Sequence, residues 1–391
     1  MGEVYNLIEV KSKNTQKEFL QFPEKLYKND PNWQKPLDIE VENLLSLKEK
    51  NESAFRWILQ KEGGDTIGRI AAFYNPKSIL NGEQAGGIGF FDCINNKLAS
   101  FQLFDAAKNW LEHKGMKAME GPTSPGMRDS FWGCLVDGFH EPVYNMPYNF
   151  PYYKDLFEDY GFRNYFNQYT YQRSLAEGGM HPAIRRRAER ILQNPDYKVR
   201  MIRKGDQKFA ADFKEIYNQA WADFSGVKEI TEDEAINLLK AMEPVIDERL
   251  IYFCYYQEKP IAFFVMTPDI GQITRRFNGK WNWLTKLQFA YQFKKGKSIN
   301  RVIGRIFGVI PEFQGRGVEG ALVIAFEKEV LKPGFPYKTL ELNWIGDFNP
   351  VMMKVCEFIG SSIYKTHVTY RYLFDQNQEF ERAPMVNIKR K

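Results

Sequence analysis

The pattern of hydrophobic and polar positions divides the first part of the chain into short helices and strands. Apolar residues with the spacing of an amphipathic helix occupy 14–28, 100–114 and 152–160. Shorter apolar runs predict strands over 55–61, 67–74, 86–93, 116–120 and 163–173. A loop rich in glycine, proline and aromatic residues separates the last two strands. We expect its residues 131–150 either to wall a substrate pocket between two halves of the protein or to pack over the first sheet.

A linker near residues 176–182 precedes a basic helix, and the same order of elements then begins again. Further helices are predicted over 207–223, 232–242, 318–331 and 350–359. Strands are predicted over 250–267, which forms a hairpin, and over 301–310, 338–344 and 362–374. This alternation predicts an α/β protein with mixed sheets and flanking helices.

Two segments with identical spacing indicate an internal repeat. The first half ends with Gly161-x3-Tyr165-x4-Thr170-Tyr171, and the second ends with Gly360-x3-Tyr364-x4-Thr369-Tyr370. Each segment follows a short predicted helix. The alternative is a coincidence between two aromatic strand ends. We interpret the spacing as one architecture used twice and divide the chain into domains 1–178 and 179–391.

The composition narrows the class of protein. Of 391 residues, 43% are hydrophobic, which is enough to form folded cores and argues against disorder. The net charge of +5 gives no reason to expect DNA as a partner. The four cysteines are widely spaced and the four histidines form no cluster, so we expect no disulfide framework and no metal site. Without a signal peptide or a long apolar run, the expected location is cytoplasmic.

The segment from Gly308 to Leu322 carries the sharpest local signal. A predicted strand leads into a glycine-rich turn and then into an apolar helix. Backbone N–H groups and the positive end of the helix converge at such a turn, which suits a phosphate or pyrophosphate. Gly315 and Gly317 would allow close approach of a ligand, and Arg316 would supply charge. The spacing matches neither the Walker loop nor the dinucleotide-binding motif.

This segment resembles the GNAT superfamily of acyl-CoA N-acyltransferases, whose signature is a strand followed by Q/R-x-x-G-x-G/A and a helix. Gln314-x-x-Gly317 matches the signature. Glu319 departs from it, because a small residue is usual there, and Gly320 comes one place later. A carboxylate would repel a pyrophosphate unless it points outward from the first helical turn, where a negative side chain is favourable.

A second segment supports the resemblance and leaves the catalytic acid open. Asn349-x2-Met352-x3-Cys356-x3-Gly360 is similar to the GNAT pattern N-x2-A-x3-Y-x3-G. Cys356 stands where many members of the superfamily have a tyrosine that protonates the leaving thiolate. The candidates for this role are therefore Tyr364, Tyr370 and Cys356 itself. The alternative for Cys356 is a buried residue that packs as a small apolar group.

The chain from about residue 5 to residue 375 resembles a poorly characterised bacterial family of tandem GNAT-like proteins. The resemblance implies two GNAT-like domains and acetyl-CoA or another acyl-CoA as co-substrate. In the first half, residues 92–100 occupy the place of the phosphate loop and contain no glycine. We therefore expect a CoA site in the second half only.

The resemblance also implies roles for individual residues. The expected CoA-binding residues are Gly308, Val309, Ile310, Gln314, Gly315, Arg316, Gly317, Val318, Gly320 and Asn349. A backbone N–H near Val309 or Ile310 would stabilise the oxyanion. The amine must lose a proton before it attacks, and Glu341 and Asp347 are the candidate bases. The alternative for either carboxylate is a solvated or capping residue.

The segment between Asp269 and Glu312 contains no acidic residue. It carries nine basic ones, which are Arg275, Arg276, Lys280, Lys286, Lys294, Lys295, Lys297, Arg301 and Arg305. Aromatic and leucine residues interleave with them. We expect residues 275–305 to meet either the CoA phosphates or an anionic lipid surface, which would place the protein at the inner face of a membrane. The alternative is a basic helix packed on the second domain.

The leading functional hypothesis is acyl-CoA-dependent N-acyl transfer to a small amine or an amino-acid-like acceptor. A second hypothesis is a degenerate GNAT fold that binds a ligand or a membrane without catalysis. A third is peptidyl transfer from aminoacyl-tRNA, although tRNA is not the expected partner. The sequence leaves the oligomeric state open.

Overall fold

A computed structural model describes residues 4–45, 53–75, 84–125, 130–177, 179–206, 208–221, 229–296 and 298–386. Residue 178, at the predicted domain boundary, and Lys297 of the basic segment lie outside these ranges. None of the helices in the described segments is long and apolar enough to cross a membrane.

The elements of the first half follow the predicted order. They are β1 (Tyr5–Glu9), α1 (Lys13–Leu26), α2 (Asp38–Leu45), β2 (Ala54–Lys61), β3 (Thr66–Phe73), β4 (Ala85–Cys93), α4 (Lys97–His113), β5 (Ala118–Gly121), β6 (Cys134–Asp137), α5 (Tyr153–Tyr160) and β7 (Arg163–Ser174).

The second half repeats the alternation with additional helices. Its elements are α6 (Pro182–Gln193), β8 (Tyr197–Met201), α7 (Lys208–Trp221), α8 (Glu232–Met242), β9 (Ile251–Tyr256), β10 (Lys259–Pro268), α9 (Gly271–Thr274), α10 (Trp283–Lys295), β11 (Arg301–Val309), α11 (Val318–Val330), β12 (Thr339–Gly346), α12 (Pro350–Phe358) and β13 (Ser362–Leu373). The sequence pattern did not predict β1, α2, β6 or β8. Each has eight residues or fewer, which is too short for a reliable period.

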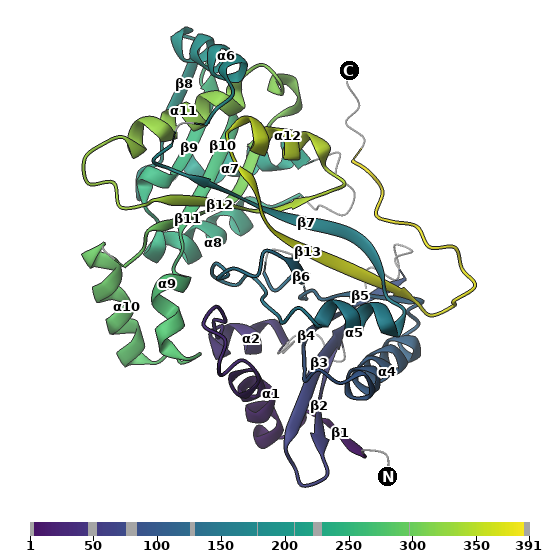
Figure 1. Ribbon diagram of the computed structural model, residues 1–391. Helices are drawn as coiled ribbons and strands as arrows, with labels where there is room; N and C mark the ends of the chain where they lie inside the picture. Colours follow the sequence, from purple (N-terminus) through teal and green to yellow (C-terminus); the bar gives the residue numbers. More distant parts are fainter. Residues whose placement is uncertain are drawn as a thin grey trace.

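The described strands form a single sheet in which the two halves exchange their last strands. The strand order is β1-β2-β3-β4-β5-β13-β7-β12-β11-β10-β9-β8, and β6 pairs with β13 beside this path. Strand β7 ends the first half in sequence but pairs with β12 of the second. Strand β13 ends the second half but pairs with β5 of the first. In Figure 1, β7 and β13 run side by side between the halves.

The predicted internal repeat is present in the fold. Gly161 and Gly360 each follow a helix with a positive φ, 107° and 81°, and each leads into one of the exchanged strands. These equivalent glycines are 199 positions apart in the sequence. The same interval separates Gln168 and His367, which lie opposite each other in the β7–β13 pair. An approximate twofold axis therefore passes between these two residues.

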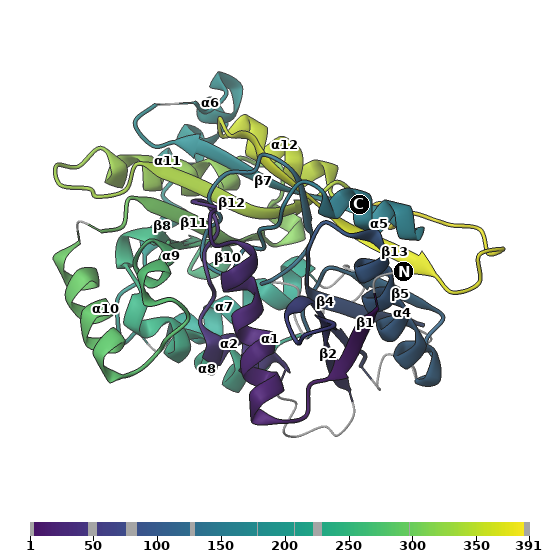
Figure 2. The ribbon, with the colours of Figure 1, turned by 60° about the horizontal axis from the view of Figure 1, so that its bottom comes forward.

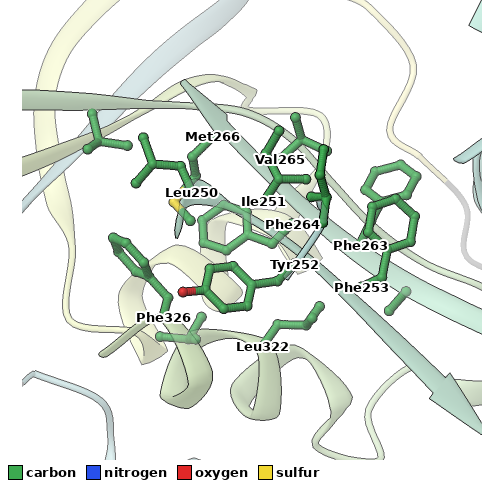
Figure 3. Packing of buried hydrophobic residues seen from close by; sticks show 14 of the residues in the cluster. Leu250, Ile251, Tyr252, Phe253, Phe263, Phe264, Val265, Met266, Leu322 and Phe326 are labelled. Atoms are coloured by element: carbon green, nitrogen blue, oxygen red, sulfur yellow. The ribbon is translucent and has the colours of Figure 1, made fainter. Parts of the chain in front are cut away.

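Each half has its own hydrophobic core. In the first half, α4 packs on β3 and buries Leu103 and Phe104 completely. Figure 3 shows the corresponding core of the second half, where side chains of β9 and β10 meet α11. There, Phe326 of α11 lies 6.1 Å from the ring of Tyr252 and 6.4 Å from that of Phe264, centroid to centroid.

The halves also meet away from the sheet. The segment between α1 and α2 packs against the 3₁₀ turn that follows α9, as Figure 2 shows from below. Asp38 donates its backbone N–H to the carbonyl of Gly279 at 2.9 Å. Arg275 donates to the carbonyl of Pro31 at 3.3 Å. These two hydrogen bonds hold the start of α2 and the segment before it against residues 275–279 of the second half.

Candidate functional site

Strands β11 and β12 separate partway along their length. They pair in parallel over the first four residues of β11, Arg301 to Gly304. From Arg305 to Val309, β10 is the partner of β11 among the described strands. A register shift in the β10–β11 pair leaves Arg305 as an extra residue at the point of separation. The other edge of β11 therefore has no strand partner over this stretch in the described chain, and we call it the open edge.

Backbone direction on β11 decides which residue faces this opening. Ile310 donates its N–H to the carbonyl of Ile261 in β10 at 3.0 Å. Because N–H groups alternate in direction along a strand, Val309 directs its own toward the open edge. The Val309 carbonyl on that edge accepts from Nε2 of Gln314 at 3.0 Å. Of the two residues expected to offer an oxyanion donor, Val309 has the suitable orientation and Ile310 does not.

The turn after β11 has the backbone of an anion-binding loop. Gly315 and Gly317 have φ angles of +70° and +103°, which favour glycine. A Cβ on Gly317 would lie 2.9 Å from that of Arg187 in α6, whereas one on Gly315 would meet no atom within 4 Å. Helix α11 begins at Val318 without a side-chain cap, so its first N–H groups have no side-chain partner.

Glu319 brings a negative charge into this turn. Its Oε1 accepts the N–H of Gly315 at 3.0 Å. The carboxylate thus takes a position that suits a phosphate oxygen, and a bound pyrophosphate would have to displace it. The exposed guanidinium of Arg316 lies 5.3 Å from the ring centroid of Phe313. A Cβ on Gly320 would lie 2.9 Å from that of Ala188, so this glycine serves the packing of α6 on α11.

The corresponding turn of the first half is occupied by its own side chains. Asn96 caps α4 by accepting the N–H of Ala99 at 2.9 Å. The backbone N–H of Cys93 donates to the hydroxyl of Tyr153 at 3.1 Å, and the hydroxyl of Tyr152 donates to the Cys93 carbonyl at 2.7 Å. A phosphate would find these donors already used, which fits the absence of glycine from this segment.

A network of buried charges lies where the halves join. Glu341 of β12 is fully buried, 2.8 Å from Nζ of Lys365 and 3.3 Å from Nη1 of Arg301. Arg301 also pairs with the buried Asp269 at 2.7 Å. Because two cations hold Glu341 away from solvent, its geometry suits a structural ion pair better than a base that exchanges protons.

Tyr364 reaches the same network from β13. Burial raises the pKa of its hydroxyl and the charge of Glu341 raises it further, whereas Gln172 and Arg301 act in the opposite direction. Its ring stacks on His140 with centroids 4.3 Å apart. The structure thus brings Tyr364 and Glu341 together.

The strand exchange changes which tyrosine lies near Cys356. Burial of Cys356 in α12 raises the pKa of its thiol to about 12. Tyr171 of β7 lies close enough for this thiol to contribute, after burial, to a phenol pKa of about 12. The Tyr171 hydroxyl has no hydrogen-bond partner among the described residues. Tyr370, its equivalent in the repeat, lies instead in the core of the first half and donates to Glu158 at 3.1 Å.

Two other predicted residues have local structural partners. Asn349 caps α12 by accepting the N–H of Met352 at 3.2 Å. Asp347 pairs with Arg382 at 2.6 Å. Asn349, expected to bind CoA, therefore serves as the N-cap of α12, and Asp347 forms an ion pair rather than a cap.

Sequence reasoning missed a carboxylate from the first half. Glu40 of α2 accepts from the hydroxyl of Tyr144, and its Oε2 is buried without a hydrogen-bond partner in the described structure. Burial raises the pKa of Glu40, whereas Tyr144, Asn145 and the charge of Arg305 lower it. Arg305 lies where β11 and β12 separate, and its charge acts on Glu40. Glu40 is therefore close enough to this point to interact electrostatically with a residue there. No local motif signals this, because α2 is short and belongs to the other half.

A cavity of about 110 Å³ is lined in part by Tyr144, whose hydroxyl donates to Glu40. Its walls come mainly from the 131–150 loop and the segment between α1 and α2, and Thr274 of α9 is the lining residue that comes from the second half. The lining includes the apolar and aromatic side chains of Trp33, Phe90, Phe131, Val143, Met146 and Tyr148 and the charged ones of Lys35, Arg69 and Asp92. The loop therefore lines a cavity that lies almost wholly in the first half, and its role as an acceptor pocket stays a prediction.

Comparisons with known proteins identify relatives of similar length. The chain is 27% identical to Protein YghO of Escherichia coli (strain K12), over 92% of this chain and 93% of that protein. It is also 27% identical to a bacterial ceramide synthase of Caulobacter vibrioides (strain NA1000 / CB15N), over 93% of this chain and 96% of that protein. No protein-family model matches the sequence.

Solved structures with a similar fold have little sequence identity. A tandem GNAT protein from the clavulanic acid biosynthesis pathway matches with a TM-score of 0.54 at 10% identity, over 95% of this chain and 99% of that one. A GCN5-related N-acetyltransferase from Sphaerobacter thermophilus matches with a TM-score of 0.52 at 9% identity, over 95% and 96%. The glucosamine N-acetyltransferase region of a fungal multidomain β-N-acetylglucosaminidase gives 0.57 at 9% identity, and this chain spans 38% of that protein. The fold of the solved structures is consistent with three features of this chain, which are the separated strands, the glycine turn and the internal repeat. The chain is a tandem GNAT-fold protein.

Proposed function

We propose that the second half of this protein transfers an acyl group from an acyl-CoA to an amine. One observation carries the proposal. The open edge of β11 leads directly into a glycine turn and an uncapped helix start, and this continuous path suits a pantetheine arm followed by a pyrophosphate. Gly315 leaves space for the pyrophosphate, and Arg316 lies exposed next to it.

The residues around the opening supply the groups that the reaction needs. The N–H of Val309 stabilises the oxyanion that forms when the amine attacks the thioester carbonyl, an effect of about 3 kcal/mol for one donor. Glu40 takes the proton that the amine loses. The Tyr171 hydroxyl donates a proton to the departing thiolate, in place of the tyrosine that Cys356 replaces. The amide forms, the carbon–sulfur bond breaks and free CoA leaves.

The roles of base and acid thus differ from those expected from sequence. Glu40 is favoured over Glu341 because one of its oxygens has no partner, whereas Glu341 is held by Lys365 and Arg301. Tyr171 is favoured over Tyr364 because it belongs to the same hydrophobic core cluster as Cys356 and its hydroxyl has no hydrogen-bond partner among the described residues.

In this proposal the acceptor places its amine in the cavity lined by the 131–150 loop. A small amine or amino-acid-like acceptor suits the volume of the cavity. A long-chain amino alcohol is a second candidate, suggested by the likeness to the ceramide synthase, and its head alone would enter the cavity. In both cases the amine nitrogen must reach Glu40.

Calorimetric titration of the 391-residue chain with CoA tests the cofactor site. We expect binding, and we expect Arg316→Gln to weaken it about tenfold because one charged contact to a phosphate is lost. The matched control is Arg203→Gln, which removes another exposed arginine. If CoA does not bind, the acyl-CoA proposal is wrong and the degenerate fold replaces it.

A further inference from the structure

Helix α10 has apolar side chains on two opposite faces. On one face, Phe289 is buried and its ring packs 5.6 Å from that of Trp281, which holds the helix on the second half. On the other face, four large apolar side chains point to solvent. They are Trp283, Leu284, Leu287 and Tyr291, exposed by 69%, 57%, 62% and 66%. No other helix in the described segments exposes so many large apolar residues.

The spacing of these residues makes one continuous patch. Trp283, Leu287 and Tyr291 follow each other at intervals of four, so they lie along one side of the helix. Leu284 lies beside them at the first turn. Figures 1 and 2 show α10 at the outer edge of the molecule, where nothing else in the described chain covers this side.

The patch is bordered by positive charge without any acidic residue. Lys286, Lys294 and Lys295 are exposed on the same helix, and Arg276 and Lys280 are exposed just before it. The whole stretch from 270 to 311 lacks aspartate and glutamate. A tryptophan and leucines flanked by lysines are typical of helices that lie in the interface of an anionic bilayer. The positive charge thus favours a negatively charged partner surface. The exposed apolar side chains favour a surface into which they can insert, as a bilayer allows.

The place of α10 along the chain favours an anionic surface over the CoA phosphates as its partner. Helix α10 precedes the start of β11, whereas the glycine turn follows its end. The nine residues of this strand span about 30 Å from one end to the other. Of the two partners that the sequence suggested for the basic segment, an anionic surface is the one that we pursue for α10.

We propose that α10 docks the protein onto membranes containing anionic phospholipid. The helix lies parallel to the surface, with Trp283, Leu284, Leu287 and Tyr291 among the headgroups and upper acyl chains, and the lysines at the phosphates. This inference does not depend on the acyltransferase proposal.

Co-sedimentation of the full 391-residue chain with vesicles tests the proposal. One set of vesicles contains phosphatidylcholine alone, and the other contains an equal mixture of phosphatidylcholine and phosphatidylglycerol. We expect binding to the mixed vesicles at low salt, weaker binding at high salt and little binding to neutral vesicles. Absence of binding to the mixed vesicles at low salt, or equal binding to both sets, would overturn the proposal.

Two pairs of variants locate the contact. Trp283→Ser with Leu287→Ser should weaken vesicle binding about tenfold or more, because two anchors no longer insert. The control, Leu98→Ser with Leu331→Ser, removes side chains that are 65% and 82% exposed elsewhere, and should leave binding unchanged. Lys294→Gln with Lys295→Gln should lower the affinity for the mixed vesicles about fivefold for each charge removed. The control, Lys154→Gln with Lys328→Gln, should leave this affinity unchanged. Equal effects of a variant pair and its control would overturn the assignment to α10.

Two other occupants would give different results. If α10 binds a second copy of the chain, light scattering will show a dimer that Trp283→Ser with Leu287→Ser dissociates. If it binds RNA, the same lysine variants will reduce binding to a labelled tRNA more than binding to vesicles. Either result overturns membrane docking. Binding of CoA, measured without vesicles, should be the same for all α10 variants, so a failure of docking is distinguishable from a failure of the acyltransferase proposal.

Discussion

At the residue scale, the proposed function gives opposite roles to two carboxylates. Glu319 accepts the N–H of Gly315 in the glycine turn, and Glu40 has a buried oxygen, Oε2, without a hydrogen-bond partner among the described residues. In the proposal, Glu319 competes with the cofactor for the same donors, and Glu40 accepts a proton from the acceptor. Single substitutions separate these two roles.

Replacing Glu319 with glutamine should strengthen CoA binding. The amide oxygen of Glu319→Gln can still accept the N–H of Gly315, but the repulsion of the pyrophosphate disappears. We expect the Kd of CoA to fall about fivefold at low salt, equivalent to roughly 1 kcal/mol, and the gain to shrink as salt screens the charges. Calorimetry measures this effect. A weaker affinity in Glu319→Gln would show that the carboxylate takes part in binding.

Replacing Glu40 with glutamine should remove the base. We expect kcat to fall about a hundredfold with little change in the KM of acyl-CoA. Because burial raises the pKa of Glu40, the wild-type kcat/KM should rise with pH through a value above the usual range of a glutamate. This acid limb should be missing in Glu40→Gln and present in the control Glu258→Gln, whose side chain is exposed. An unchanged acid limb in Glu40→Gln would assign the base elsewhere.

At the scale of elements, the exchanged strands β7 and β13 form the centre of the molecule. His367 of β13 lies at the approximate twofold axis, fully buried, with Nε2 3.3 Å from the carbonyl of Pro147 and the ring of Trp132 4.9 Å away. Burial lowers the pKa of this histidine to about 3. The fold therefore holds the neutral ring, and the junction of the halves is sensitive to acid.

His367 should make the protein less stable as the pH falls. Its pKa is lower in the folded state, so its contribution is present above the unfolded value of 6.5 and is lost as the pH falls toward 3. We expect a loss of roughly 1 kcal/mol per pH unit from this group. The free energy of unfolding, measured with urea between pH 7 and pH 5, should change less with pH for His367→Leu than for the wild type. The exposed control His113→Leu should keep the wild-type slope, and equal slopes for both variants would contradict this role.

The ion pairs of β12 and β13 should matter for stability. Glu341→Gln leaves Lys365 and Arg301 with one anion fewer, so we expect a loss of about 3 to 5 kcal/mol in the free energy of unfolding. Glu258→Gln, which breaks an exposed pair with Lys198, should leave the free energy of unfolding almost unchanged. Urea denaturation at neutral pH compares them. Unchanged stability together with a large fall in kcat would return the base role to Glu341.

At the scale of the whole molecule, the sequence predicts the local elements but not the strand exchange that joins the two halves. The glycine turn, the repeat and the longer helices are visible in spacing and periodicity. The strand exchange is not, because β7 and β13 carry the same pattern and either could close either sheet. For this reason the sequence considered Tyr370 beside Tyr364 and Cys356 for the acid, whereas the fold places Tyr171 and not Tyr370 in the core that contains Cys356. Glu40 was missed because it lies on a short helix of the other half. The repeat did contain one signal, since Tyr171 and Tyr370 are equivalent within it.

We propose that the two halves act as one working unit. The second half offers the cofactor path, and the first half supplies Glu40 and much of the cavity wall. Incubation of the 391-residue chain with an acyl-CoA and a panel of amines, from small amino acids to long-chain amino alcohols, tests this most directly. We predict by mass spectrometry one N-acylated amine for each free CoA released, with loss of product in Glu40→Gln. Release of no CoA with any amine, from a chain that also fails to bind CoA, would contradict the account.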